Sequence, residues 1–187
     1  ADGNRVRLPI ATINALLLGP GTSVTHEAIK IASAANCAIC WVGEDSLLFY
    51  ASGVVPTSNT RNLQRQAWLS TDKDASLVVA RAFFAKRFPD AELEGKTLQE
   101  MMGMEGLRVR NFYLEKAEQY KVGWKGRVFT PGKFELSDLT NQILTSTNAA
   151  LYGVLCSCVH SLGYSPHLGF IHSGSPLPFV YDLADLY

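Results

Sequence analysis

The chain has 187 residues, of which 47% are hydrophobic and 18% are charged, and its formal net charge is zero. This amount of apolar material can form a sizeable core, which excludes an intrinsically disordered chain. No segment has the length and hydrophobicity of a membrane span or the pattern of a signal peptide, so we expect a soluble, cytoplasmic protein that does not bind membranes.

The charged residues are distributed unevenly, although they cancel overall. Residues 60–133 hold 14 Lys or Arg and 9 Asp or Glu, whereas residues 134–187 hold no Lys or Arg and 4 acidic residues. A basic middle followed by an acidic end suits a phosphate-contacting surface beside a cation site. On charge alone, however, an ordinary solvated helical face is the better explanation of the basic surplus.

The first part of the chain carries strand patterns. Residues 6–10, 13–18, 37–42 and 47–51 predict four strands, and Thr25 is placed to cap a helix over residues 26–35. Cys37 and Cys40 form a C-x-x-C pattern within the third predicted strand. Residues three apart on a strand point to opposite faces, so we interpret these cysteines as buried thiols rather than as metal ligands.

The pattern changes to helical after residues 53–62, whose glycine, proline and polar residues predict a linker. Helices are predicted over residues 63–69, 75–88, 97–122, 138–162 and 179–187, with Ser137 as the cap of the fourth. Thr97 and Glu100 fit a capping box, and Gly123 suits the end of that helix.

These patterns predict an α+β fold in two domains. A small β-rich domain covers residues 1–52, a linker covers 53–62, and a larger all-α domain covers 63–187. Both ends look truncated, because residues 1–3 resemble a hairpin turn without a preceding strand and the last helix stops without a cap.

Two acidic residues near the end of the chain are the first candidates for chemistry. Asp182 and Asp185 are three apart on a predicted helix whose other residues are largely apolar, so both carboxylates share one partly buried face. Two like charges in such a place repel and lose hydration, and a bound cation is the simplest compensation. The alternative is that both aspartates stay half-exposed and favour the helix dipole.

Two further residues are weaker candidates when each is taken alone. His172 ends an apolar run ten residues before Asp182, where a histidine is more often hydrogen-bonded than a ligand. Glu105 interrupts the apolar stripe of a predicted helix between two nearby glycines. An ion pair with Arg108, three residues later, is its simplest interpretation.

Taken together, these residues resemble a known family. The segments that match are Met-Glu-Gly-Leu-Arg-Val-Arg around Glu105, Gly-Phe-Ile-His-Ser-Gly around His172, and Tyr-Asp-Leu-Ala-Asp ending at Asp185. The chain is similar to the universal CRISPR-associated integrase/endonuclease, CRISPR-associated protein one, in the form found in subtype I-E systems. The match continues through residues 18–22, 41–44, 50–53, 141–142 and 151–153, and covers essentially the whole chain.

The resemblance implies both a site and a set of partners. It implies that Glu105, His172 and Asp185 bind a divalent metal, and that Asp182 is a nearby acidic residue needed for full activity. Family members dimerise and bind a small second CRISPR adaptation protein, which gives a heterohexamer. The β-rich domain is then the dimerisation domain. The assembly inserts short DNA fragments into the CRISPR repeat, so the expected DNA partners are the double-stranded prespacer and the repeat.

The ligand types indicate how such a site works. Two carboxylates and one imidazole leave positions open on a six-coordinate ion, and they suit Mg²⁺ or Mn²⁺, with the imidazole favouring Mn²⁺. The attacking group is a DNA 3′-hydroxyl or water, so no nucleophilic side chain is needed. Candidate DNA contacts are Arg108, Arg110, Lys125, Arg127 and Tyr152.

Two other functions remain open from the sequence. The first is a non-catalytic architectural subunit of the same complex, in which the metal site goes unused. The second is a metal-dependent hydrolase of a small phosphorylated molecule, which predicts a closed pocket instead of a basic groove. The basic surplus of residues 60–133 argues against this second function.

Overall fold

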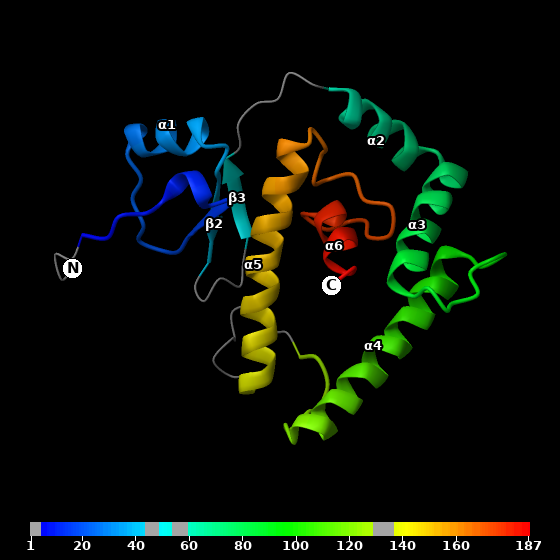
Figure 1. The fold of residues 1–187 in the computed structure, drawn as a ribbon. Helices are drawn as coiled ribbons and strands as arrows, with labels where there is room; N and C mark the ends of the chain where they lie inside the picture. The colour runs from blue at the N-terminus through cyan, green and yellow to red at the C-terminus, as the bar shows by residue number, and fades with distance from the viewer. Residues whose placement is uncertain (1–4, 44–48, 54–59, 129–136) are drawn as a thin grey trace.

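The computed structural model of the protein describes residues 5–43, 49–53, 60–128 and 137–187. A three-stranded sheet comes first and long helices follow (Figure 1). The α+β class predicted from the sequence is therefore confirmed. Within the described residues, no helix combines the length and the apolar character that crossing a membrane requires.

The sheet consists of β1 (Ala15–Leu18), β2 (Ala38–Val42) and β3 (Phe49–Gly53), in that order. β1 and β2 run parallel and are connected through α1 (His26–Ala34), whereas β2 and β3 are antiparallel. The predicted cap of α1 is confirmed, because the Thr25 side chain accepts a hydrogen bond from the Ala28 N–H at 3.2 Å.

The strand predicted over residues 6–10 is wrong. Residues 5–9 have no regular structure, and a short 3₁₀ helix, η1 (Ile10–Thr12), follows them. Pro9 explains part of the difference, because it has no N–H to donate to a neighbouring strand. Most residues of this segment are exposed, so its alternating pattern does not reflect a buried face.

Five helices follow the sheet in residues 60–128 and 137–187. They are α2 (Arg61–Thr71), α3 (Lys73–Arg87), α4 (Leu98–Tyr120), α5 (Leu139–Ser161) and α6 (Pro178–Ala184). The capping box of Thr97 and Glu100 at the start of α4 is confirmed. The predicted ends need small corrections. α2 and α3 each begin two residues earlier than predicted, Asp138 caps α5 instead of Ser137, Lys121 ends α4 in a left-handed conformation before Gly123, and α6 ends at Ala184.

α5 connects the two parts of the fold. The sheet lies on one side of it and α6 on the other, while α2, α3 and α4 form an arc beyond α6 (Figure 1). The Ser157 hydroxyl donates to the Asn14 carbonyl at 2.7 Å. A Cβ at Gly153 would lie 2.7 Å from Leu17 Cδ2, so glycine lets α5 approach β1 closely. The predicted domain boundaries stay a prediction, because residues 54–59 of the linker lie outside the described residues.

Three apolar clusters hold these elements. One lies between α1 and the sheet and contains Ala32, Cys37 and Ile39. A second joins α3 to α4 around Phe84 and Met101, and it includes Ile171 of the loop before α6. The third packs α6 against α5 and includes Phe170 of the same loop. Loop residues 170 and 171 therefore reach into both helical clusters, which fixes the backbone next to His172.

Candidate metal centre

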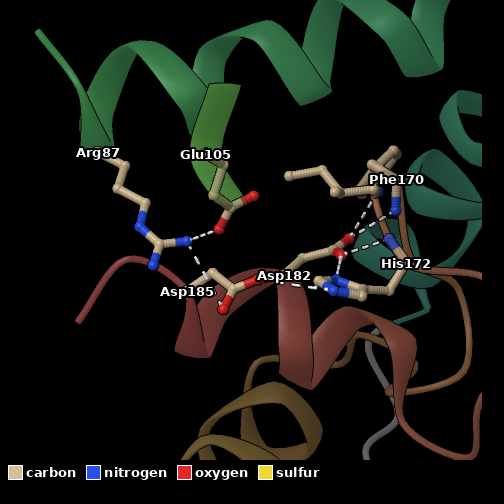
Figure 2. Close-up of polar contacts among 7 residues, drawn as sticks. Arg87, Glu105, Phe170, His172, Asp182 and Asp185 are labelled. Carbon is tan, nitrogen blue, oxygen red and sulfur yellow. Dashed lines mark hydrogen bonds and ion pairs between the residues drawn. The ribbon is translucent and has the colours of Figure 1, made fainter. Parts of the chain in front are cut away.

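Asp182, in α6, is completely buried, and its carboxylate accepts four hydrogen bonds (Figure 2). Oδ2 accepts from the backbone N–H groups of Phe170 at 2.6 Å and Ile171 at 3.2 Å. Oδ1 accepts from the backbone N–H of His172 and from its Nδ1, both at 2.9 Å. These donors satisfy the buried charge. Asp182 therefore anchors the loop and is not free to bind an ion.

His172 is oriented by this anchor. Because Nδ1 donates to Asp182, Nε2 is the nitrogen left to accept, and it lies 3.6 Å from Asp185 Oδ2. The Tyr181 ring packs edge-on to the imidazole, with 6.0 Å between centroids. The hydrogen bond to Asp182 raises the pKa of His172 against the opposing effect of burial. A carboxylate behind an imidazole in this way is typical of metal-binding histidines.

Glu105 and Asp185 face each other across the site. Glu105 comes from α4, and Asp185 is the C-cap residue directly after α6 (Figure 2). Burial raises the pKa of both carboxyl groups, and the charge of Asp185 raises that of Glu105 further. Positive charge on Arg87 and His172 lowers both pKa values in part. The two carboxylates are therefore poorly solvated, and cationic partners are needed to stabilise their charged forms.

Arg87, the last residue of α3, is the cation that the sequence did not indicate. Its Nη1 donates to Glu105 Oε1 and lies 3.6 Å from Asp185 Oδ1. The predicted partner of Glu105 was Arg108, but Arg108 Nη1 instead contacts Asp90 Oδ1 at 2.9 Å. Arg87 is 18 residues from Glu105, so helix spacing could not pair them. The sequence offered one indication of a role for Arg87: it lies in the last turn of α3, where a cation is favoured by the helix dipole.

Local sequence features hold the loop before α6 in place. A Cβ on Gly169 would lie 2.6 Å from the His172 carbonyl oxygen and 2.8 Å from Pro178 Cβ, so this position requires glycine. Pro178 occupies the first turn of α6, where its missing N–H has no helical partner to lose. Buried Gln66 of α2 exchanges hydrogen bonds with the backbone of Ser165 and donates to the Leu168 carbonyl, all within 2.9 Å.

The side chains suit a divalent ion in their chemistry. Glu105, His172 and Asp185 together offer carboxylate oxygens and one imidazole nitrogen, the donors that Mn²⁺ or Mg²⁺ takes. Their present arrangement is not a finished site: no group of three or more potential ligands is ready to hold an ion among the described residues. The Arg87 guanidinium contacts both carboxylates, so an ion that binds them has to replace it.

The five candidate DNA-contacting residues differ in exposure and in the groups that they contact. Arg110 and Lys125 are exposed, and Arg108 lies over the Phe88 ring while it pairs with Asp90. Arg127 donates to Asn141 and Thr145 of α5, so it attaches the segment after α4 to that helix. Tyr152 is half-buried and packs edge-on against Tyr181, 5.0 Å between centroids. The ring of Tyr181 contacts both Tyr152 and His172, so Tyr152 is linked to the site through Tyr181.

Known proteins resemble the whole of this chain, although no protein-family model matches it. It is 69% identical over 186 residues to a CRISPR-associated endonuclease Cas1 of Chlorobaculum tepidum, covering 100% of the chain and 63% of that protein. The crystal structure of TtCas1 superposes with a TM-score of 0.83 at 36% identity, covering 97% of this chain and 68% of that one. A TtCas1-DNA complex gives a TM-score of 0.68 at 40% identity, with 96% and 67% covered.

The fold and the similar proteins thus define a class, since the curated relatives all carry the name CRISPR-associated endonuclease Cas1 and a solved Cas1 structure shares the fold. Within it, the chain belongs to the Cas1 family. It spans about three fifths of the length of the curated relatives that it matches, from 60% to 63% for the first three. The family resemblance seen in the sequence is therefore confirmed.

Proposed function

We propose that the protein is a subunit of a metal-dependent DNA integrase and endonuclease that inserts short foreign DNA fragments into a CRISPR array. One observation carries the proposal. His172 is fixed by buried Asp182 so that Nε2 faces Asp185, and Glu105 of a different helix faces the same space. The relatives named as Cas1 endonucleases and the TtCas1-DNA complex support DNA as the substrate.

In this proposal Glu105, His172 and Asp185 hold one Mg²⁺ or Mn²⁺. Bound there, the ion supplies Lewis-acid polarisation of the scissile phosphate and stabilises the charge that develops on it. The protein keeps the imidazole in the tautomer whose Nε2 can accept, through the Asp182 carboxylate. In integration a DNA 3′-hydroxyl attacks the phosphorus and a DNA oxygen leaves, so one phosphodiester is exchanged for another. In nuclease action water takes the place of the 3′-hydroxyl.

The proposed partners follow from family membership. They are double-stranded DNA as prespacer and repeat, a second copy of the chain, and the small second adaptation protein that completes a heterohexamer. Within the described residues, exposed Arg110 and Lys125 carry the free positive charge that suits phosphate contacts. Arg127 contributes to such a surface only by holding its segment on α5.

Strand transfer into a repeat-containing plasmid tests the proposal. The intact protein is incubated with its small partner, a short duplex and Mn²⁺, and wild type is compared with Glu105→Ala and His172→Ala. His167→Ala is the matched control, because His167 is an exposed histidine on the same loop whose ring nitrogen Nδ1 contacts the Pro176 carbonyl. We expect at least a hundredfold loss for the first two and wild-type transfer for the control. Transfer that survives both substitutions would falsify the metal site, and turnover of free nucleotides without action on DNA would refute the substrate.

A further inference from the structure

Arg87 has a position that the proposed reaction does not yet use. Its guanidinium reaches from the end of α3 to the two carboxylates that the ion requires, touching Glu105 and lying 3.6 Å from Asp185 Oδ1. The side chain is only 20% exposed, and its guanidinium also lies 5.3 Å from the centre of the Phe88 ring. Arg87 is therefore a packed part of the site and not a solvent-exposed surface cation.

The guanidinium and a metal ion compete for the same oxygens. An ion shared by Glu105 and Asp185 would lie about 2.1 Å from one oxygen of each. A guanidinium nitrogen that already contacts Glu105 Oε1 fills the space between these oxygens. Two cations this close would also repel strongly in a half-buried site. Either the ion or Arg87 can occupy the position, but not both.

We propose that Arg87 is a built-in counter-ion that holds the place of the divalent metal and is displaced when the metal binds. This inference rests on the proposed function, because it takes Glu105, His172 and Asp185 as the ligands. In the metal-free protein Arg87 neutralises two partly buried carboxylates that would otherwise repel each other. The site therefore stays folded without its ion, and metal binding exchanges one cation for another.

The displaced guanidinium has an obvious new acceptor. It loses Glu105 and Asp185 to the ion but remains close to it, because α3 fixes its backbone next to the site. A phosphate bound at the ion presents free oxygens, and arginine matches phosphate with two parallel hydrogen bonds. Arg87 then becomes a phosphate-contacting residue in the loaded complex. The same side chain thus serves the metal-free and the DNA-bound states with different partners.

An ordinary supporting role for Arg87 predicts the opposite sign. If Arg87 only oriented Glu105 and Asp185 as ligands from outside the ion's position, its loss would weaken metal binding. If it holds the ion's position, its loss removes a competitor and a repelling charge, so metal binding becomes tighter. The direction of the change in Mn²⁺ affinity therefore separates the two roles, which stability measurements alone would not.

The experiment is a titration of the metal-free protein with Mn²⁺, followed by calorimetry, for wild type, Arg87→Gln, Arg87→Lys, Lys86→Gln and His172→Ala. Lys86 is the matched control, because it is an exposed cation in the same last turn of α3. We expect Arg87→Gln to bind Mn²⁺ about tenfold more tightly than wild type, a factor typical of one charged hydrogen bond. Arg87→Lys, which keeps the charge on a single ammonium, is expected to lie between the two, and Lys86→Gln to match wild type.

Two further readouts use the same proteins. Without metal, Arg87→Gln is expected to melt at a lower temperature than Lys86→Gln, and Mn²⁺ is expected to raise its melting temperature more. At saturating Mn²⁺, Arg87→Gln is expected to transfer strands at least tenfold more slowly than Lys86→Gln, although it binds the ion more tightly. Undiminished transfer would overturn the phosphate contact.

The outcomes distinguish this inference from the proposed function. Unchanged or weaker Mn²⁺ binding by Arg87→Gln, with binding lost in His172→Ala, overturns the role of Arg87 and leaves the metal site standing. Equal Mn²⁺ binding by wild type and His172→Ala overturns the metal site itself. Tighter binding by Arg87→Gln together with lost binding by His172→Ala supports both.

Discussion

Replacement of Asp182 by asparagine tests whether this residue stabilises the loop of residues 170–172 that positions His172. The substitution keeps the shape of the side chain but removes its charge and turns one acceptor oxygen into an NH₂ group. Two of the four donors that now meet the carboxylate then face another donor. Asp182 is completely buried, so water cannot replace the lost acceptor.

The magnitude follows from these four hydrogen bonds. A hydrogen bond to a charged group contributes about 1.5–3 kcal/mol, and an unsatisfied buried donor costs a similar amount. Because the loop can shift to relieve part of the conflict, we expect Asp182→Asn to lower the free energy of unfolding by about 3 kcal/mol. Asp182→Ala, which leaves all four donors without a partner, is expected to cost about 3–5 kcal/mol.

Urea unfolding, followed by circular dichroism, measures this effect, and Asp185→Asn is the matched control. Asp185 is at the end of the same helix, but its side chain is 37% exposed and its two ion pairs are both 3.6 Å long. We expect Asp185→Asn to change the free energy of unfolding by less than about 1 kcal/mol. Both variants are expected to lose Mn²⁺ binding. If Asp182→Asn proves as stable as Asp185→Asn, the assignment of Asp182 as the anchor of the loop is wrong.

Three other predictions concern the loop before α6, the cap of α4 and the cysteine thiols. Gly169→Ala is expected to lower the free energy of unfolding by about 1–3 kcal/mol and to weaken Mn²⁺ binding, because its Cβ would meet backbone atoms including the His172 carbonyl; urea unfolding with wild-type stability would contradict this. Thr97→Ala removes the capping box of α4 and is expected to cost about 1 kcal/mol with unchanged Mn²⁺ affinity. Iodoacetamide at pH 9 is expected to label exposed Cys158 but not Cys40, because burial raises the pKa of the Cys40 thiol to about 12; mass spectrometry that finds Cys40 labelled in the folded protein would refute its burial.

Much of the fold could be predicted from the chain itself, because its helices carry local signals. The capping box at Thr97 and the Thr25 cap depend on neighbouring residues only, and both were predicted correctly. The strand over residues 6–10 failed because alternation of apolar residues does not show whether a pairing partner exists. The end of α4 shifted because Lys121 adopts the left-handed conformation more usual for glycine.

The site was only partly predictable, for a different physical reason. The spacing of Asp182 and Asp185 predicted one shared helix face, and in the structure both carboxylates lie near the His172 ring. Spacing could not show that backbone N–H groups satisfy Asp182 while Asp185 remains half-exposed, because that division depends on the loop of residues 170–172. It also could not find Arg87, whose partners come from two other helices. The assignment of Glu105, His172 and Asp185 as ligands remains a prediction from family resemblance and residue chemistry.

The most direct test of this assignment is an anomalous difference map from crystals of the protein soaked in Mn²⁺, recorded near the manganese absorption edge. We predict one strong peak about 2.1 Å from Glu105, His172 Nε2 and Asp185, with the Arg87 guanidinium turned away. The absence of a peak at these three residues, or a peak bound to other side chains while Arg87 still contacts Glu105, would contradict it.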